Sequence, residues 1–583
     1  MNYPKLRVPR ASRQMVDTFK GYNHNLRIDD GEFFDMKNMT SDYYPVLSPR
    51  GKRGVYASPT HPTGLIAKDS LCYVDGSKFV INGYPIEMGL SDDPKQLISM
   101  GAYVIILPDK MWINTKCWVN DGEFDTENGY GNIEASFTST TDVTFSLCSL
   151  DGEEYGGVKY TQATEPASPE NNDLWIDTSD ATHCLKQYSS ASAMWVQIAT
   201  TYIKIQATGI GTYFNQYDGV TISGVVSEKL QDLNASMVIW EKGDDFIVVV
   251  GILDKEMGQR DPITVERKMP AMDFVIESEN RLWGCRYGLA NNREVVNEIY
   301  ASKLGDFKNW SCYMGLSTDS YTASCGTDGQ FTGAITHMGH PLFFKENCVH
   351  KVYGNYPANF QIQTTACSGV QKGCDKSLAI VNTTLFYKSR SGVCAYDGSL
   401  PIEMSYALGT EVYGNAVGGA HGSKYYISMQ DQKGEFHLFV WDSSKSMWHK
   451  EDDLHVESFC SCRGEMYAIA DGKIITMHGD NEDSVEWLVE TGEIGLSSPD
   501  MKYISRLTVR MAMDIGAEVR FYAQYDLIDE WENVGTLTGT SLRSFSIPIR
   551  PKRCDFMKLR IEGVGGCKIY SITKTIEQGS ELS

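Results

Sequence analysis

The side chains most suited to chemistry are few and scattered in this sequence. His337 and His340 have a spacing that two metal ligands could use, and Cys460 and Cys462 place two thiols on one face of an extended strand. A glycine and a proline in the same stretch break any helix there, so a polar turn is the favoured interpretation of the two histidines. No second Cys or His pair with ligand spacing accompanies the thiols, which indicates packing rather than a metal or redox pair.

Acidic residues could bind a cation or act as catalytic acids and bases. The acidic turns at 243–245 and 451–453 could bind a divalent cation weakly, but acidic loops are usually only solvated. Residues 317–321 begin like the Ser-x-Asp-x-Gly-x-x-Trp box of sialidase-type propellers and then lack its glycine and tryptophan. The chain contains no nucleophile elbow, phosphate-binding loop, dinucleotide fingerprint, zinc-protease motif or EF-hand loop. We therefore expect no catalytic residue, no metal, no cofactor and no enzymatic activity.

Short strands rather than helices must position these side chains. Few stretches repeat at the helical period, alternation of apolar and polar residues is common, and 53 glycines serve many turns. A unit of two strands around a polar turn, ending in one copy at Tyr396-Asp397-Gly398, recurs about every 40 residues from Leu342 to Met466. This period is typical of four-stranded β-propeller blades, which bury both faces of each sheet only when the ring closes.

Changes in this pattern divide the chain into five regions. Blade-like units occupy residues 56–120 and 269–480, and an Asn-, Thr- and Gly-rich stretch, 121–268, separates them as an inserted β-domain. Residues 481–583 alternate apolar and polar side chains and predict a β-sandwich, and residues 1–55 are expected to be an extended basic arm and platform segment. The predicted fold is therefore all-β: a propeller of roughly six to eight blades, interrupted by an inserted β-domain and followed by a C-terminal β-sandwich.

The composition argues against several classes of protein. Hydrophobic residues make up 42% of the chain and aromatic residues 11%, which favours folded cores over disorder. A net charge of −22 argues against a nucleic-acid-binding protein. No apolar run has the length of a membrane span, and the N-terminus lacks the apolar core of a signal peptide. Fifteen scattered cysteines, an odd number, indicate reduced thiols in a protein made in a cytoplasm.

Several motifs stand in an order shared with a known family. Near the N-terminus they are Phe19-Lys20-Gly21-Tyr22-Asn23, Gly31–Thr40 and Tyr44–Arg50. Further along they are Asn280-Arg281-Leu282-Trp283, Ile299-Tyr300-Ala301-Ser302, Gly305–Trp310 and Tyr396-Asp397-Gly398. This order resembles the phage tail nozzle proteins, also called tail tubular or packaged-DNA-stabilisation proteins, over residues 19–50 and about 280–400. Residues 173–179 with Trp195 are similar to a short motif of phage tail and tip proteins.

The resemblance implies a virion structural protein that forms a conduit for the genome. Members of the family are propellers with inserted and platform domains, and they form a hexameric ring that retains the DNA and then releases it during ejection. The implied partners are further copies of the chain, portal and adaptor proteins above the ring, and tail-tip or fibre proteins below it. Genomic DNA would pass through without specific binding, since an acidic lumen repels phosphates. The protein would have no membrane span and would reside in the tail of a virion assembled in the bacterial host cytoplasm.

Two alternatives to the conduit stay open. The first is a baseplate or tail-tip protein that binds the host surface. The second belongs to a different class, a propeller glycoside hydrolase, which would be favoured by three acidic side chains converging on the propeller axis beside aromatic platforms.

The N-terminal segment differs in charge from the rest of the chain. Residues 1–53 hold ten Lys or Arg and six acidic residues, whereas the whole chain holds 53 basic and 75 acidic side chains. We expect residues 1–18 to lie along an acidic surface of a neighbouring subunit or adjoining ring protein, with the aromatic residues that follow anchored in a core. The predicted inter-subunit docking residues are Arg7, Arg10, Arg13, Phe19, Tyr22 and Arg50.

Overall fold

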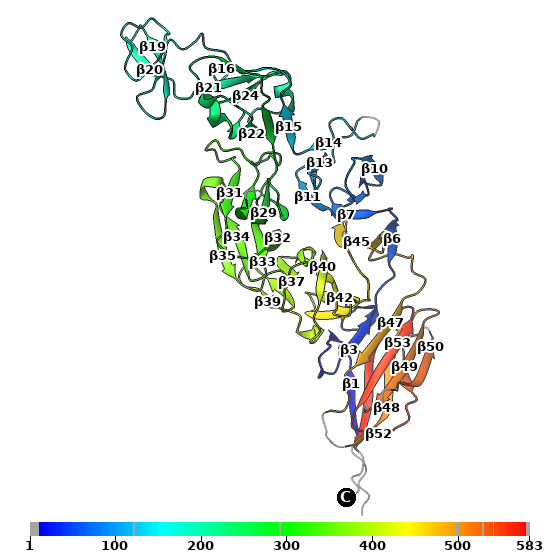
Figure 1. Cartoon of the computed structure of the whole chain (residues 1–583). Helices are drawn as coiled ribbons and strands as arrows, with labels where there is room; N and C mark the ends of the chain where they lie inside the picture. Colours follow the sequence, from blue (N-terminus) through cyan, green and yellow to red (C-terminus); the bar gives the residue numbers. More distant parts are fainter. Residues whose placement is uncertain are drawn as a thin grey trace, which may run out of the picture.

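Strands make up nearly all the regular structure of the chain. The computed structural model describes residues 11–119, 123–290, 293–496, 501–526, 530–539 and 541–578, and the helices in these ranges are short 3-10 turns. This confirms the predicted all-β class. No helix within the described ranges has the length and apolar character needed to cross a bilayer. Figure 1 shows the inserted domain, the propeller and the sandwich one after another along the molecule.

Seven four-stranded antiparallel sheets form the propeller, a number within the predicted range. Two blades precede the inserted domain: β7 (Pro62–Ala67), β8 (Leu71–Asp75), β9 (Lys78–Ile81) and β10 (Tyr84–Glu87), then β11 (Gln96–Met100), β12 (Tyr103–Leu107), β13 (Met111–Asn114) and β14 (Tyr130–Asn132).

Four complete blades follow the inserted domain. The third and fourth are β28 (Phe274–Ser278), β29 (Arg281–Leu289), β30 (Val295–Ala301) and β31 (Tyr321–Ser324), then β32 (Phe331–His337), β33 (His340–Lys345), β34 (Cys348–Tyr353) and β35 (Gln361–Ala366). The fifth and sixth are β36 (Ala379–Val381), β37 (Thr384–Lys388), β38 (Val393–Tyr396) and β39 (Ile402–Glu403), then β40 (Gly414–His421), β41 (Lys424–Gln430), β42 (Phe436–Asp442) and β43 (Met447–Lys450).

The seventh blade closes the ring with a strand from the N-terminal region. It consists of β44 (Ser458–Cys462), β45 (Glu465–Ala470), β46 (Lys473–Thr476) and β6 (Gly54–Ala57). Its innermost strand β44 contacts both β40 of the sixth blade and β7 of the first. Because neighbouring blades cover both faces of a blade, middle strands are apolar without alternation, and Leu342, Phe343 and Phe344 of β33 are all fully buried.

Strands from near both ends of the chain build the sandwich. One sheet has the order β1 (Ala11–Val16), β54 (Cys567–Gln578), β48 (Lys502–Met513) and β51 (Arg543–Ile547), with β52 (Arg553–Cys554) also on β48. The other sheet has the order β2 (Gly21–Tyr22), β3 (Glu32–Lys37), β47 (Glu486–Thr491), β53 (Met557–Val564), β49 (Glu518–Tyr525) and β50 (Glu532–Thr538). Two short strands, β4 (Met39–Thr40) and β5 (Ser48–Pro49), follow β3.

Two predicted boundaries differ from the structure. The described residues 11–55 are not a separate arm and platform, because β1 to β3 are strands of the sandwich and β6 belongs to the propeller. The boundary at residue 120 cuts the second blade, because its last strand β14 lies beyond that residue and pairs with β13 through Trp112 and Gly131.

The inserted domain leaves the propeller and returns to it at adjacent positions. Its first strand, β15 (Ala135–Thr138), pairs with its last, β27 (Thr264–Arg267), and Ala135 lies opposite Arg267. Its other main strands are β16 (Val143–Cys148), β21 (Tyr202–Gln206), β22 (Gly219–Ser223), β23 (Ser236–Val238), β24 (Glu241–Lys242), β25 (Phe246–Val250) and β26 (Met257–Gln259). They enclose a core of their own. A further small sheet, β17 (Tyr160–Gln162), β18 (Leu174–Asp177), β19 (Cys184–Ser189) and β20 (Met194–Gln197), lies at the far tip (Figure 1).

Candidate functional site

A cavity of about 460 Å³ lies where the innermost strands of the propeller begin. We call it the axial cavity, because five of the seven blades contribute to its wall. The contributing segments are Thr63 of β7, Pro94 before β11, Asp375 before β36, Val417 of β40 and Ser458 of β44. A concave cavity with several convergent polar groups is the default candidate for a binding site.

Three carboxylates and one aromatic platform line the axial cavity. Asp92 and Glu457 are exposed, whereas Asp375 is half-buried and its burial raises the pKa of its carboxyl group. The ring of Phe436 stacks on His455 with ring centroids 3.9 Å apart. Acids beside an aromatic platform are the features that the glycosidase alternative requires.

A buried ion-pair network lies between the propeller and the sandwich. Arg50 donates to Glu482 at 2.7 Å, and Arg53 donates to Glu451 at 2.7 Å and to Asp452 at 2.5 Å. Burial alone would lower the pKa of Arg53, but the charges and hydrogen bonds of Glu451 and Asp452 together outweigh burial and raise it. The expectation that the acidic turn 451–453 is merely solvated is wrong, because two of its carboxylates face these guanidinium groups.

The predicted docking residues have partners within their own chain or lie outside the described residues. Arg7 and Arg10 lie outside the described residues. Arg13 is exposed on β1, opposite Thr575 of β54. The described part of the expected arm is therefore an edge strand of the sandwich, and backbone pairing with β54 satisfies those of its amides and carbonyls that face β54.

The other three predicted docking residues are buried. Phe19 is 3% exposed and stacks against Phe33, and Tyr22 is 5% exposed and packs against Phe439. The Arg50 side chain is only 8% exposed. The expected anchoring of the aromatic residues in a core is present, but Phe19, Tyr22 and Arg50 stabilise this chain and offer little surface to a neighbour.

The other side chains singled out in the sequence have structural partners. His337 donates a ring N–H to the Thr383 carbonyl at 2.7 Å, and His340 is 3.2 Å from the Val352 carbonyl, as a polar turn requires. Burial raises the pKa of the Cys460 thiol to about 12. All fifteen cysteines are free thiols.

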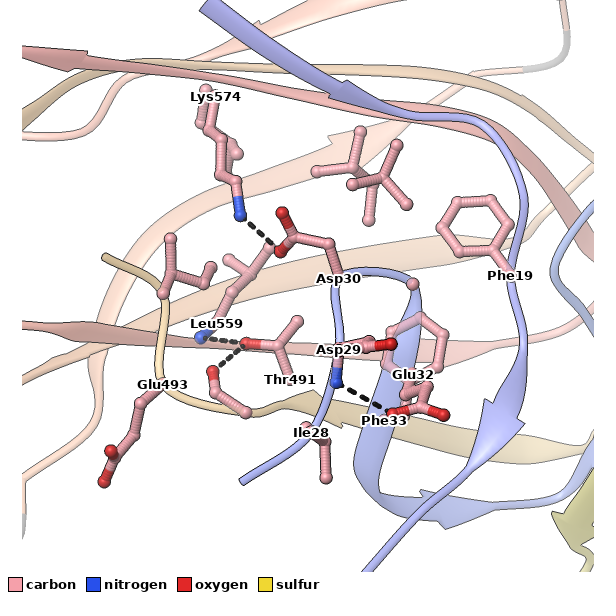
Figure 2. A pocket seen from close by; sticks show the side chains of 16 residues that line it. Phe19, Ile28, Asp29, Asp30, Glu32, Phe33, Thr491, Glu493, Leu559 and Lys574 are labelled. Atoms are coloured by element: carbon pink, nitrogen blue, oxygen red, sulfur yellow. Dashed lines mark hydrogen bonds and ion pairs between the residues drawn. The ribbon is translucent and has the colours of Figure 1, made fainter. Parts of the chain in front are cut away.

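A small cavity lies within the sandwich (Figure 2). Its volume is about 40 Å³, and Phe19, Phe33 and Leu559 line it. Lys574 donates to Asp30 at 2.6 Å beside it. It has room for a few water molecules but not for an organic ligand.

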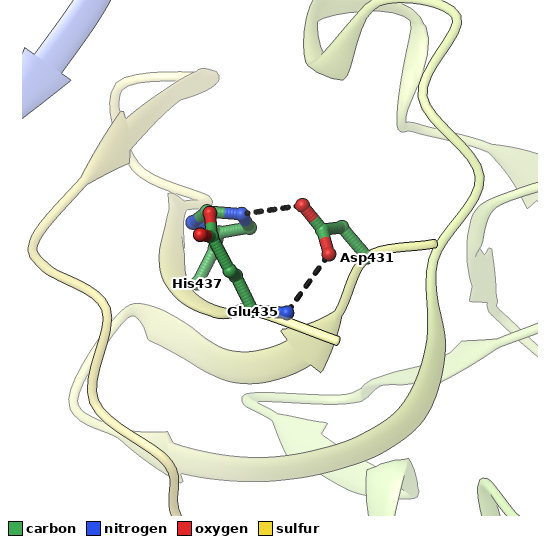
Figure 3. Close-up of side chains that lie close together, drawn as sticks. All are labelled: Asp431, Glu435 and His437. Atoms are coloured by element: carbon green, nitrogen blue, oxygen red, sulfur yellow. Dashed lines mark hydrogen bonds and ion pairs between the residues drawn. The ribbon is translucent and has the colours of Figure 1, made fainter. Parts of the chain in front are cut away.

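A hairpin of the sixth blade brings together one cluster that was not predicted from the sequence: Asp431, Glu435 and His437 (Figure 3). The signal was an Asp-x-x-x-Glu-x-His spacing, which points to a metal only when the two strands are known to be paired.

Comparisons with known proteins give only remote likenesses. No protein-family model and no curated protein matches the chain. An acylaminoacyl peptidase of Pyrococcus horikoshii is 8% identical over 53% of this chain and 55% of its own, so the match spans about half of that protein, with a TM-score of 0.24. An exo-β-1,3-galactanase of Phanerochaete chrysosporium is 9% identical over 52% of this chain and 94% of its own, with a TM-score of 0.20.

A third solved structure covers more of the chain. PorZ, a surface component of the type-IX secretion system of Porphyromonas gingivalis, is 9% identical over 89% of this chain and 82% of its own, with a TM-score of 0.24. TM-scores this low give no argument about function, so the function has to be inferred from the chain itself.

Proposed function

We propose that this protein is a structural subunit of a phage tail conduit of the nozzle or tail-tube kind. The observation that carries the proposal is the location of the family-like motifs. The N-terminal motifs and those between residues 280 and 310 lie at the two places where the sandwich, the propeller and the inserted domain are joined, whereas Tyr396-Asp397-Gly398 lies in the fifth blade. A conduit subunit bears mechanical load, so this role requires residues that fix the parts of the subunit to one another.

The first motif joins the sandwich to the propeller. Gly21 has a φ of +90°, and a Cβ there would lie within 2.2 Å of the Trp448 carbonyl oxygen, so glycine alone fits this close approach. The next residue, Tyr22, packs against Phe439 with ring centroids 5.5 Å apart. Arg50, at the end of the same motif region, belongs to the buried ion-pair network.

The second motif joins the propeller to the inserted domain. Asn309 donates its side-chain amide to Asp218 at 2.9 Å and accepts the Gly219 amide at 2.9 Å. Arg281 is buried and donates to the carbonyls of Ser302 and Asp319 at 2.8 and 2.6 Å, which fixes the loop that carries Asn309. A chain in which all three parts are tied together in this way suits a rigid wall.

Immunogold electron microscopy tests this proposal. An antiserum against the purified chain should label phage particles from the host culture that carries this gene, with the gold confined to the tail. Gold that is absent from the particles, or that lies on the capsid, would contradict a tail-conduit role.

A second candidate function rests on the axial cavity. Its three carboxylates and the stacked Phe436–His455 pair support a glycan-binding or glycan-cleaving propeller. A glycan panel decides between the two: cleavage by the natural chain that is lost in Asp375→Asn would favour the enzyme, and no cleavage by either would favour the conduit.

A further inference from the structure

A hairpin of the sixth blade gathers three potential metal ligands. Strand β41 ends at Gln430 and β42 begins at Phe436, so the turn between them brings Asp431 and Glu435 close to His437 on the second strand (Figure 3). One ligand atom from each of the three side chains lies within 4.8 Å of the other two. Two ligands bonded at about 2 Å to one tetrahedral ion lie roughly 3.3 Å apart, and His437 Nε2 and Asp431 Oδ2 have this separation, 3.3 Å. Glu435 is exposed, so its side chain can turn to bring a carboxylate oxygen to the same ion.

The histidine ring is oriented from outside this cluster. His437 Nδ1 lies 2.9 Å from an oxygen of Asp453, which belongs to the loop after β43. A proton on Nδ1 is donated to Asp453, and the lone pair of Nε2 then points toward Asp431, whose Oδ2 is 3.3 Å away. A carboxylate that fixes the second nitrogen of a histidine is the usual support of a metal-binding imidazole.

The carboxylates of Asp431 and Glu435 are also available to a cation. Asp431 Oδ1 accepts the backbone amides of Lys433 and Glu435 at 2.8 and 2.9 Å, which holds the carboxylate in place and leaves Oδ2 available. The Glu435 carboxylate has no hydrogen bond or ion pair with any described residue. No Lys or Arg side chain in the described ranges pairs with either of these two acids.

We propose that Asp431, Glu435 and His437 bind one first-row divalent cation, with Zn²⁺ as the best match. An imidazole nitrogen suits Zn²⁺ better than Mg²⁺ or Ca²⁺, and three protein ligands leave a position for water. The competing interpretation is an imidazolium ion held between Asp431 and Asp453 with no metal. This inference does not depend on the proposed function.

The bound ion would stiffen the wall of the axial cavity. Phe436 lies between Glu435 and His437 in the sequence, and its ring forms the stacked pair with His455 in that wall. A cation bonded to both neighbours of Phe436 would fix the start of β42.

Zinc titration of the full chain, followed by calorimetry and metal analysis after dialysis, tests the site. The natural chain should bind one Zn²⁺ with a Kd of about 10 μM or tighter. His437→Gln and Asp431→Asn should abolish this binding, and Asp453→Asn should weaken it by about 10- to 100-fold because the ring loses its orientation. His183→Gln, which changes an exposed histidine just before β19, should bind like the natural chain.

Three results would overturn the proposal. They are no binding by the natural chain, stoichiometric binding that persists in both His437→Gln and Asp431→Asn, and displacement of Zn²⁺ by an equal concentration of Mg²⁺. Circular dichroism and a thermal melt of each metal-free variant establish that a loss of binding is not a loss of fold.

Discussion

At the scale of single residues, buried charged side chains connect the propeller to the sandwich. Arg53 and Glu451 are both buried, and with Arg50 they lie between the propeller and the sandwich. Removing one partner of such a pair is costly, since the other charge stays in a low-dielectric environment. The network therefore makes the relative placement of the two parts sensitive to single substitutions.

Arg53→Met should lower the free energy of unfolding by about 3 kcal/mol or more, because Glu451 then keeps only a 4.0 Å contact with Arg50. Urea denaturation followed by tryptophan fluorescence measures the loss. Lys20→Met, which removes an exposed ion pair with Asp29, is the control and should change stability by no more than about 1 kcal/mol. Equal, small losses in both variants would mean that the network is solvated.

His449 gives the chain a sensitivity to acid. It is 1% exposed, neither ring nitrogen has a hydrogen-bond partner among the described residues, and burial lowers its pKa from 6.5 to about 3. Between these two pH values the unfolded chain binds a proton that the folded chain does not, so stability falls as the pH falls. This one residue lowers the free energy of unfolding by about 1.4 kcal/mol for each pH unit.

His449→Phe should remove this contribution, and the urea midpoint should then fall less steeply between pH 6.5 and 4.5. Some dependence should remain, because burial also lowers the pKa of His350, to about 4. His183→Gln is the control and should follow the natural chain. Parallel profiles for His449→Phe and the natural chain would show that His449 does not titrate on unfolding.

At the scale of elements, ring closure by β6 decides whether the propeller is one body. This strand pairs with β46 through Val55 and Ile475. Gly479, just after β46, faces the start of β6, and a Cβ there would lie 2.5 Å from the backbone N and Cα of Gly54. Backbone atoms cannot move aside without displacing the closing strand.

Gly479→Ala should therefore destabilise the chain by about 1–3 kcal/mol. It should also speed amide hydrogen exchange in both β6 and β46. Gly51→Ala adds a methyl group where nothing lies within 4 Å, so it should leave stability and exchange unchanged. Closure would prove insensitive to this contact if the two variants behaved alike.

The inserted domain should be separable from the propeller. Ala135 and Arg267 are paired neighbours, so a short Gly-Ser linker can replace residues 135–267. We expect the shortened chain to keep a cooperative thermal transition and the excised domain to fold alone around its own core. Circular dichroism of both pieces is the measurement, and an unfolded spectrum for either would mean that contacts such as Asn309–Asp218 are essential.

The sequence predicted those elements whose signal is local. The 40-residue period is visible because doubly buried strands such as β33 and β41 repeat the same apolar runs. The pairing of β1 with β54 and of β6 with β46 joins residues from opposite ends of the chain, and no local pattern reports it. The axial cavity could not be predicted from the sequence for the same reason, since Asp92, Asp375 and Glu457 come from separate blades.

At the scale of the whole molecule, three parts follow one another end to end (Figure 1). Buried polar contacts such as Arg53–Glu451 and Asn309–Asp218 join them. The sandwich and the inserted domain stand at opposite ends of the propeller, so each is available for a different neighbour. A net charge of −22 is consistent with a wall past which DNA slides without binding. These features suit a subunit that works as one of several identical copies.

The mass of the assembled protein tests this account most directly. Native mass spectrometry of the full chain, over a range of protein and salt concentrations, should show a species of six copies, since the conduit needs a closed ring. A single chain at every concentration, together with cleavage of a glycan that depends on Asp375, would contradict the conduit and favour the enzyme.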